Sequence, residues 1–484
     1  MFQLKKIFWP KFNFPRFLLI LILLIFGLGL LTGYIIFGQN RPQIVRNQSE
    51  KEIHSAFLME IYDKILENYW DNISEEQLAQ LFKQASEKIV GKPQKLQSSG
   101  KTKSTPNPVQ AQLQTGNTSG LSINLQGSSI NDLKILNQDD NKPPTDQKQA
   151  LQNLLQNILK DLEDSKKKEF TKTLAATILS GLTPPGRSGL FTQKQEEQLK
   201  NTVQNVNPEK DLYKDLGLAK GASQQDIQKS YQEKEEELKK DTSPQAQEEL
   251  KKIAYAKDVL TDQDKKKNYD TKGVEPTTNS KLISADIAYL KFDKFSPTTY
   301  EEFVKIVKSY DKQDGPKALI FDLRGNIGGA IDALPFFLGN FLGDKQYVYD
   351  FMRKGELEPY KTVGTKLAGL ARMKQVVILV DNQTQSSAEL LAVALKRYRY
   401  GVVLGIPTKG WGTVEKVFNL ENQFDPSEKF SLFLVHSLTL RDDGQPLEGR
   451  GLEPDINIKE TNWEEKLFEY FRNPSLGVAI KSVL

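Results

Sequence analysis

Two short apolar runs that end in turns rich in glycine or serine constrain the fold of this chain more than any other feature. The first run, Lys317–Asp322, leads directly into a turn with paired glycines. The second, Val376–Val380, leads into the polar turn Asp381–Gln385, and Ser386 and Ser387 then open a helical pattern. Apolar runs of this length, followed by a turn and a helix, are typical of buried parallel strands. The sequence therefore predicts a parallel α/β core.

A serine at a strand-to-helix turn has two interpretations. Its hydroxyl can cap the helix that follows, which is a common role for serine at that position. It can also be a nucleophile, because the amides of a helix N-terminus stabilise an oxyanion beside them. The paired glycines Gly328 and Gly329 favour the chemical interpretation of Ser386, since glycine lets the backbone approach a ligand and point amides at it.

These two segments and two later ones resemble the C-terminal-processing, or tail-specific, serine proteases. The similarity covers roughly Ile283 to Ile458 and rests on four motifs in the family's order. They are Asp322-Leu323-Arg324-Gly325-Asn326-Ile327-Gly328-Gly329, Ser386-Ser387-Ala388-Glu389, Pro407–Val414 and Gly449–Asp455. The resemblance implies proteolysis of polypeptides or of their C-termini by a serine nucleophile with a lysine base.

The resemblance also assigns the candidate site residues. It implies that Ser386 is the nucleophile. It implies further that the backbone amides of Gly328, Gly329 and Ser387 form the oxyanion hole. Such amides stabilise the negative charge that develops on a carbonyl oxygen during acyl transfer.

The lysine base is where this sequence departs from the family. The position expected to carry it is Trp411, and the supporting residue expected in the helix after the serine falls on Arg397. An indole cannot accept a proton from serine. Lys409 would serve only if it reached the Ser386 hydroxyl and were held neutral by desolvation. Two hypotheses stay open: a serine-type endopeptidase with a displaced Ser386–Lys409 dyad, or an inactive pseudopeptidase that binds polypeptides as an adaptor.

Composition disfavours several other kinds of binding and catalytic site. The 484 residues suffice for two or three domains, and the net charge of +4 favours no anionic partner such as nucleic acid. The chain has no cysteine and two histidines, His54 and His436, so disulfides are excluded and a zinc site or a Ser–His pair is not expected. No cofactor is predicted. The expected partners are a polypeptide and a membrane.

The N-terminus predicts a membrane anchor. Residues 17–37 form an apolar run long enough to cross a bilayer as a helix. Residues 1–16 carry four cations and no acidic residue, which indicates that they stay in the cytoplasm. The run is long for a cleaved signal peptide and lacks a clean cleavage site, so an uncleaved signal anchor is predicted. The rest of the chain would then lie outside the cell membrane.

Between this anchor and the α/β core, the patterns predict mostly helices. Residues 55–90 repeat apolar side chains at helical spacing, with a capping box at Ser74 and Gln77. Residues 91–147 are rich in Gln, Ser, Asn and Gly without periodicity, which predicts a disordered insertion. Helical spacing returns in residues 148–205.

Residues 208–274 resemble a J-domain, at the place where the protease family usually carries a PDZ domain. The matching pieces include Leu212-Tyr213, Ala222-Ser223 with Asp226-Ile227, Ala254-Tyr255 and Tyr269-Asp270. Two facing apolar stripes predict an antiparallel helical hairpin. J-domains stimulate a chaperone ATPase through His-Pro-Asp, but the loop here reads Lys239-Lys240-Asp241. We therefore expect the fold and a docking or spacing role, and a chaperone partner is not expected. A J-domain-type co-chaperone stays as a third hypothesis.

Residues 282–460 are predicted to form the protease-like core and residues 461–484 a C-terminal helical segment. We expect the first strand of the core at 282–292, a helix at 330–342 and a C-terminal helix at 463–471. Residues 414–420 and 432–440 alternate in a way that predicts two antiparallel strands.

Overall fold

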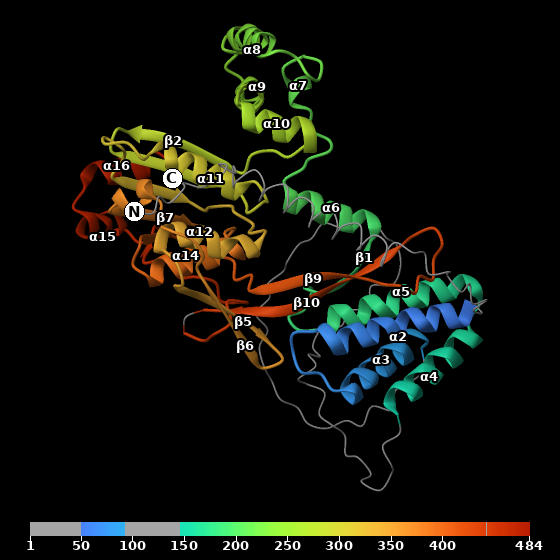
Figure 1. The fold of residues 1–484 in the computed structure, drawn as a ribbon. Coiled ribbons are helices and arrows are strands. Elements are labelled where there is room, and N and C mark those ends of the chain that lie inside the picture. Colours follow the sequence, from blue (N-terminus) through green and yellow to red (C-terminus); the bar gives the residue numbers. More distant parts are fainter. Residues whose placement is uncertain (1–49, 92–145, 442) are drawn as a thin grey trace, which may run out of the picture. The chain divides into compact units, whose positions relative to one another are not determined.

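The computed structural model describes residues 50–91, 146–441 and 443–484 of the chain (Figure 1). The predicted membrane anchor, the residues before it and most of the insertion at 91–147 lie outside these described ranges. Within the described ranges, none of the helices has the length and apolar character needed to cross a bilayer. The described residues from 51 onward belong to one compact unit.

A six-stranded sheet forms the core of the protease-like region. Its strand order is β11-β8-β7-β4-β3-β2, with parallel pairing throughout except between β3 and β2. The predicted parallel α/β core is therefore confirmed. The prediction of a single strand at 282–292 is wrong, because this stretch contains parts of two antiparallel strands. Ala285 and Asp286 form the turn between them, and the alternation of apolar and polar residues in the sequence continues across that turn without marking it. The strands are β2 (Thr278–Ser284), β3 (Ile287–Phe292), β4 (Ala318–Asp322), β7 (Gln375–Val380), β8 (Val402–Gly405) and β11 (Ile456–Asn457).

Helices cover both faces of this sheet. Side chains alternate along each strand, so Leu319 and Phe321 of β4 pack into one apolar cluster and Ile320 packs into another. The first cluster includes side chains of helices α11 to α14, and the second includes side chains of α15 and α16. The helices are α11 (Thr299–Ser309), α12 (Leu334–Leu342) after the 3₁₀ turn η2 (Ile331–Ala333), α13 (Ala368–Arg372), α14 (Ser387–Arg397), α15 (Trp463–Phe471) and α16 (Pro474–Lys481).

A second, antiparallel sheet adjoins this core. The expected pair of strands at 414–420 and 432–440 is confirmed as β9 (Thr413–Asn419) and β10 (Phe430–Leu440). β10 also pairs with β1 (Gly189–Thr192) and with β5 (Tyr347–Arg353), which forms a hairpin with β6 (Glu356–Lys361). Positive φ angles at Lys354 and Gly355 mark the tight turn of that hairpin. The sequence patterns did not reveal β1, β5 or β6.

The N-terminal helices form a bundle whose apolar side chains pack against Leu432, Leu434 and Val435 of β10. The predicted capping box at Ser74 and Gln77 is present. The helices are α2 (Glu50–Asn68), α3 (Glu75–Ile89), α4 (Gln147–Asp161) and α5 (Asp164–Gly181), followed beyond β1 by α6 (Gln193–Gln204).

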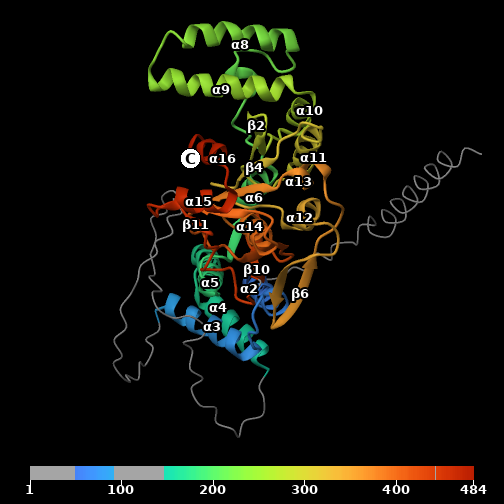
Figure 2. The same ribbon diagram turned by 90° about the vertical axis from the view of Figure 1, so that its left-hand side faces the viewer.

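The J-like region is the expected helical hairpin. Its two long helices lie side by side in Figure 2, and apolar side chains such as Ile227 and Ile253 meet between them. Ser223 and Asp226 form a capping box at the start of the first helix. The elements are α7 (Leu212–Asp215), α8 (Gln224–Leu238), α9 (Pro244–Thr261) and α10 (Gln263–Lys272).

Candidate active site

Ser386 lies in a strained turn between β7 and α14. Its backbone has φ 57° and ψ −127°, a region that residues other than glycine rarely adopt and that costs on the order of 1–3 kcal/mol. Strain of this kind between a strand and a helix exposes the serine hydroxyl at the edge of the sheet in α/β-hydrolase folds. The turn geometry thus fits a nucleophile better than an ordinary helix cap.

The glycine turn after β4 lies directly against Ser386. A methyl group placed on Gly328 would lie 2.6 Å from the Ser386 Cβ and 3.1 Å from its Oγ. A methyl group on Gly329 would lie 2.1 Å from the carbonyl oxygen of Phe295. Both glycines also have positive φ, at 85° and 134°. Only glycine fits these two positions, and the fold brings Gly328, Gly329, Ser386 and Ser387 together.

The amides of this cradle are not equally available. The Gly328 N–H donates to the Asn326 Oδ1 at 2.8 Å, so it is already occupied. Within the described ranges, the amides of Gly329 and Ser387 donate to no acceptor, and Ser387 is the first residue of α14. The Ser387 hydroxyl donates to the Gly329 carbonyl at 3.1 Å, which fixes the two segments against each other. Gly329 and Ser387 are therefore the free pair of donors beside Ser386.

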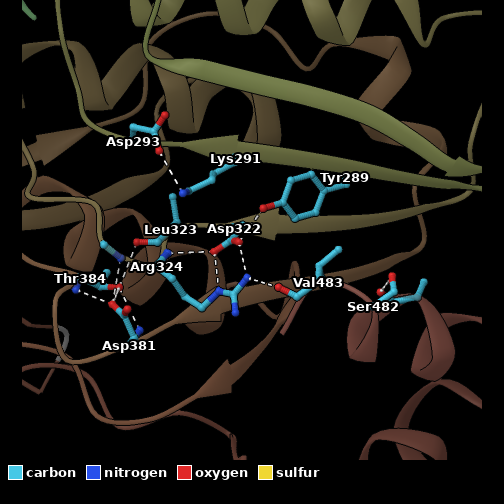
Figure 3. Close-up of polar contacts among 12 residues, drawn as sticks. Tyr289, Lys291, Asp293, Asp322, Leu323, Arg324, Asp381, Thr384, Ser482 and Val483 are labelled. Carbon is cyan, nitrogen blue, oxygen red and sulfur yellow. Dashed lines mark hydrogen bonds and ion pairs between the residues drawn. The ribbon is translucent and has the colours of Figure 1, made fainter. Parts of the chain in front are cut away.

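A polar network joins the glycine turn to the serine turn (Figure 3). Asp381 Oδ1 accepts the Gly325 amide at 3.0 Å and the Thr384 amide at 2.9 Å. The buried Thr384 hydroxyl donates to the Leu323 carbonyl at 3.0 Å. These bonds connect the ends of β4 and β7, so the two turns are positioned as one body.

A buried ion pair fixes the end of β4. Asp322 is buried, and its Oδ1 accepts the Arg324 Nε at 2.9 Å while its Oδ2 accepts the Tyr289 hydroxyl at 2.7 Å (Figure 3). Arg324 also donates to the Val483 carbonyl at 2.7 Å. The hydrogen bond that Arg324 donates to Asp322 holds the pKa of the Arg324 guanidinium above its ordinary value. The Asp-Leu-Arg part of the motif is thus structural and supports the glycine turn from below.

Glu389 is a positioning residue whose role the motif alone did not reveal. Its side chain is completely buried, and its carboxylate accepts the Ser386 amide at 2.8 Å. The same carboxylate accepts the Thr408 hydroxyl at 2.5 Å and the amides of Gly410 and Trp411 at 2.7 and 2.9 Å. Burial raises the pKa of the Glu389 carboxyl, and these four donors act against that rise. The available signal was a charged residue in an otherwise apolar helical turn.

Trp411 is fixed by polar contacts in the position where the resemblance expects lysine. Its indole Nε1 donates to the Glu415 Oε1 at 3.1 Å, and burial raises the pKa of that carboxyl. The Arg187 guanidinium carbon lies 3.4 Å from the Trp411 ring centroid. Arg187 also pairs with Glu448 at 2.9 Å, and Glu448 accepts the Gly412 amide at 2.7 Å. None of the residues in this cluster is a neutral amine that could accept the proton of Ser386.

Lys409 and Arg397 differ in their relation to the site. The Lys409 amide donates to the Thr384 carbonyl at 2.9 Å, so its backbone touches the serine turn. Its side chain is exposed, and among the described residues no hydrogen bond or ion pair involves its ammonium group. Arg397 ends α14, on the order of 16 Å along the helix from Ser386, and stacks on Tyr347 at 4.3 Å. The structure therefore puts Glu415, and not Arg397, beside Trp411.

The two histidines lie in other elements. His54 on α2 is buried against α5, where its Nδ1 lies 2.8 Å from the Thr171 Oγ1. His436 is on β10, with its Nε2 3.3 Å from the Lys416 Nζ. Burial lowers the pKa of each to about 4. Neither forms a hydrogen bond with Ser386.

Comparison with known proteins supports the resemblance. Residues 286–458 match the family model of peptidase family S41, and residues 211–270 match that of the DnaJ domain. The chain is 26% identical to the carboxy-terminal-processing protease of Bartonella bacilliformis, over 37% of this chain and 40% of that protein. It is 27% identical to carboxy-terminal processing protease CtpB of Bacillus subtilis, over 38% and 37% of the two lengths. The chain thus spans about two fifths of the length of these curated relatives.

Among solved structures, one similar chain is the photosystem II D1 C-terminal processing protease, at 20% identity and a TM-score of 0.33 over 38% of this chain and 49% of that one. A putative S41 protease from Bacteroides fragilis matches at 16% identity and the same TM-score, over 44% and 59% of the two chains.

Proposed function

We propose, from the premise that residues 286–458 are a peptidase family S41 domain and residues 211–270 a DnaJ domain, that this chain binds extended polypeptides at Ser386 without hydrolysing them efficiently. The observation that carries the proposal is the occupation of the expected lysine position by Trp411. The Trp411 side chain is held by Arg187 and Glu415, and its amide by Glu389.

The chemical argument concerns the serine proton. A serine hydroxyl becomes a competent nucleophile when an adjacent base takes its proton. The indole N–H of Trp411 is a donor only, and it already donates to Glu415. Within the described chain, Ser386 has no neutral amine or imidazole in hydrogen-bond contact. A general base contributes roughly 10²–10⁴-fold to such reactions, so its loss leaves at most weak hydrolysis.

Binding does not need that base. The free amides of Gly329 and Ser387 can donate to a carbonyl oxygen of a bound polypeptide, or to its C-terminal carboxylate. The N-terminus of α14 adds a favourable dipole for partial negative charge at the same place. The cradle is held together by the Asp381, Thr384 and Glu389 contacts, so these donors are already in position before a ligand arrives.

The test measures binding and cleavage together on the full chain. A fluorescent peptide with a free C-terminus is titrated against the chain, and its cleavage is followed by mass spectrometry. We expect saturable binding, and cleavage that stays near background. Ser386→Ala should change neither result by more than about twofold, whereas Ser386→Trp should block the cradle and abolish binding. Efficient cleavage that Ser386→Ala removes would contradict the proposal.

A second candidate is the serine-type peptidase with Lys409 as a displaced base. The observation that favours it is the bond between the Lys409 amide and the Thr384 carbonyl, which keeps this lysine beside the serine turn. A bound polypeptide would have to exclude water and bring the amine to Ser386. Cleavage lost in both Ser386→Ala and Lys409→Ala, but kept in Lys416→Ala, would establish this dyad.

We also propose that residues 17–37 anchor the chain in the cell membrane with its N-terminus in the cytoplasm. The support is the apolar run and its basic flank. Because the chain has no cysteine, single cysteines report topology without background. In intact cells, a membrane-impermeant maleimide should label Glu465→Cys and leave Lys5→Cys unlabelled until lysis. The opposite pattern would reverse the orientation.

For the DnaJ domain, we propose a docking or spacing role in place of chaperone stimulation. The loop between α8 and α9 begins Lys239-Lys240-Asp241 and lacks the His-Pro-Asp on which stimulation depends. We expect the full chain to leave the ATPase rate of a DnaK-type chaperone unchanged. A several-fold stimulation that is lost on Asp241→Ala would contradict this role.

A further inference from the structure

The last strand of the parallel sheet, β2, has an unpaired edge. β2 pairs with β3 on one side only and ends the sheet. The Asp293 amide donates to the Thr277 carbonyl at 2.9 Å, although the Thr277 N–H itself donates to Glu302. Within β2, the residues that face β3 are therefore Asn279 and Lys281. The residues that alternate with them, Ser280 and Leu282, turn their N–H and C=O groups outward, where no strand of the described chain lies.

The Thr278 amide, which precedes Ser280 and Leu282 on the outward side of β2, already has an acceptor. The Thr278 N–H donates to the Glu302 Oε2 at 3.0 Å, and the Thr278 hydroxyl donates to the same oxygen at 2.9 Å. The same oxygen accepts the Thr277 N–H at 2.9 Å, so this carboxylate from α11 holds both amides at the start of β2. The edge is thus satisfied at Thr278 and open at Ser280 and Leu282, and Leu282 is 56% exposed.

A groove lies beside the start of this edge. It has a volume of about 510 Å³ and is lined by Thr278, Asn279 and Ser280 of β2, by α11, and by the end of the J-like region. That volume lies within the range of ordinary ligand sites. A strand added beside β2 would lie about 4.8 Å from it, with its backbone bonded to Ser280 and Leu282.

The J-like wall of the groove is fixed by polar contacts. Lys305 of α11 pairs with Asp262 at 3.3 Å and with Asp264 at 2.7 Å. At the connection into β2, the buried Glu275 accepts the Lys210 ammonium at 2.6 Å and the Tyr255 hydroxyl at 2.7 Å. These contacts give the groove two defined sides.

The charges of the groove favour a basic occupant. Its lining contains five carboxylates and three ammonium groups. The ammonium groups of Lys265 and Lys305 are paired with carboxylates of the J-like region. Glu301, by contrast, is exposed and has no ion-pair partner among the described residues. Lys267, the third ammonium group, is likewise exposed and has no ion-pair partner among the described residues. The lining therefore carries two more carboxylates than ammonium groups, one from α11 and one from the J-like region.

From these observations we propose that the groove between α11 and the J-like region binds an extended polypeptide segment carrying Lys or Arg, which adds a strand to the free edge of β2. Main-chain bonds to Ser280 and Leu282 supply affinity, and Glu301 selects basic side chains. The site is separate from the Ser386 cradle: the cradle is built from the turns that follow β4 and β7, and β3 lies between β4 and β2 in the sheet. It gives the J-like region a structural reason for its place in the chain.

The test uses the full chain and a labelled peptide of alternating valine and lysine, with a valine–glutamate peptide as its charge control. Affinity is measured by fluorescence anisotropy, and the bound region by hydrogen exchange. We expect the lysine peptide to bind, the glutamate peptide to bind at least tenfold more weakly, and residues 278–284 to gain protection. Protection confined to 325–330 and 385–388 would overturn the groove and leave the Ser386 proposal standing.

Two variants separate backbone pairing from charge. Ser280→Pro removes an outward N–H without breaking the ladder to β3, so it should weaken binding at least tenfold, whereas Ser280→Thr should stay within about twofold of the parent. Glu301→Lys should weaken the lysine peptide and strengthen the glutamate peptide, with both effects shrinking at high salt. If Ser280→Pro fails to fold, Glu301→Lys decides alone, and unchanged affinities overturn the proposal.

A second copy of the chain is the remaining occupant to exclude. Mass photometry of the parent without peptide should show a monomer. A dimer that disappears in Ser280→Pro would show that β2 pairs with β2 of another copy, and this would overturn the proposed polypeptide ligand.

Discussion

The two sides of the candidate active site differ in kind. The glycine–serine side, residues 322–330 and 381–387, has the strained serine, the close glycines and two free amides that acyl chemistry uses. The loop side, residues 407–415, holds Trp411 where the resemblance expects a base. The glycine–serine side consists mainly of backbone, and the strands of the sheet set its geometry. The second depends on one side chain, and its replacement is stabilised by Arg187, Glu415 and Glu448.

The difference teaches that the side chain at position 411 can change without disturbing the fold around the serine. Glu389 bonds to the Ser386 amide on one side and to the amides of Gly410 and Trp411 on the other. These bonds use the backbone of residue 411 and not its side chain. A change of that side chain therefore leaves the spacing between the two sides in place.

The largest expected effect comes from rebuilding the loop side. Trp411→Lys places an amine there, but Glu415, now bonded to the indole at 3.1 Å, would hold that amine protonated. Combining Trp411→Lys with Glu415→Gln removes the negative charge of the carboxylate. The nearby cation of Arg187 then disfavours the protonated form of the new lysine. We expect the double variant to cleave peptides at least about 100-fold faster than Trp411→Lys alone, by a continuous fluorescence assay.

Adding Ser386→Ala to the double variant should abolish that activity, which shows that the rebuilt amine acts through the serine. Equal activity in Trp411→Lys with and without the Glu415 change would show that the carboxylate does not restrain the amine. A silent double variant would mean that the glycine–serine side is also incompetent.

The next effect tests how rigid the glycine–serine side is. Gly329→Ala would place its methyl group 2.1 Å from the Phe295 carbonyl oxygen, so we expect a loss of at least about 3 kcal/mol in unfolding free energy. Gly325 is the matched control, because its φ is 72° and no atom lies within 4 Å of the added methyl group. Gly325→Ala should cost about 1–2 kcal/mol. Equal losses in urea denaturation would show that the cradle can relax.

Sequence patterns predicted the parts of the molecule that depend on local periodicity or on backbone motifs. The parallel core, the β9–β10 pair and the J-like hairpin follow from apolar spacing, and Gly328 and Gly329 follow from a motif. The pattern could not reveal contacts between distant segments. Arg187 lies 224 positions before Trp411 in sequence, and nothing near either residue indicates that they stack.

The expected position of the residue that supports the base shows the same limit. The resemblance puts that position at Arg397, in the helix after the serine, yet the helix carries Arg397 away to Tyr347. Glu415 lies on β9, which begins at Thr413, and its carboxylate accepts the hydrogen bond of the Trp411 indole in the preceding loop. A helix or strand can be predicted from sequence, but the direction of its side chains toward another segment depends on the tertiary fold.

A smaller effect is expected from loosening the clamp on Trp411. Arg187→Ala removes the stacking cation and leaves Glu448 without its ion-pair partner, and both side chains are mostly buried. We expect a loss of about 2 kcal/mol in unfolding free energy and higher hydrogen exchange in residues 411–415. Arg187→Lys keeps the charge but not the two-nitrogen contact with Glu448, so it should recover only part of this loss. Unchanged exchange would show that the loop is held by Glu389 alone.

The smallest expected effect is a pH dependence that arises outside both sides of the site. Burial lowers the pKa of His54 to about 4, below its ordinary value of 6.5, so the neutral form is favoured by folding. Its contribution to stability is therefore present above pH 6.5 and is lost as the pH falls toward 4. Between pH 7 and pH 5 the unfolding free energy should drop by about 2 kcal/mol on account of this group.

His54→Gln should reduce that drop. His436→Gln on β10 should reduce the total drop separately, because burial also lowers the pKa of His436 to about 4. Peptide binding at Ser386 should keep the same affinity over this interval in both variants, since neither histidine contacts the cradle. If affinity instead changed with the His54 titration, the helical bundle would be coupled to the site through β10, and the two sides could not be treated as an isolated pair.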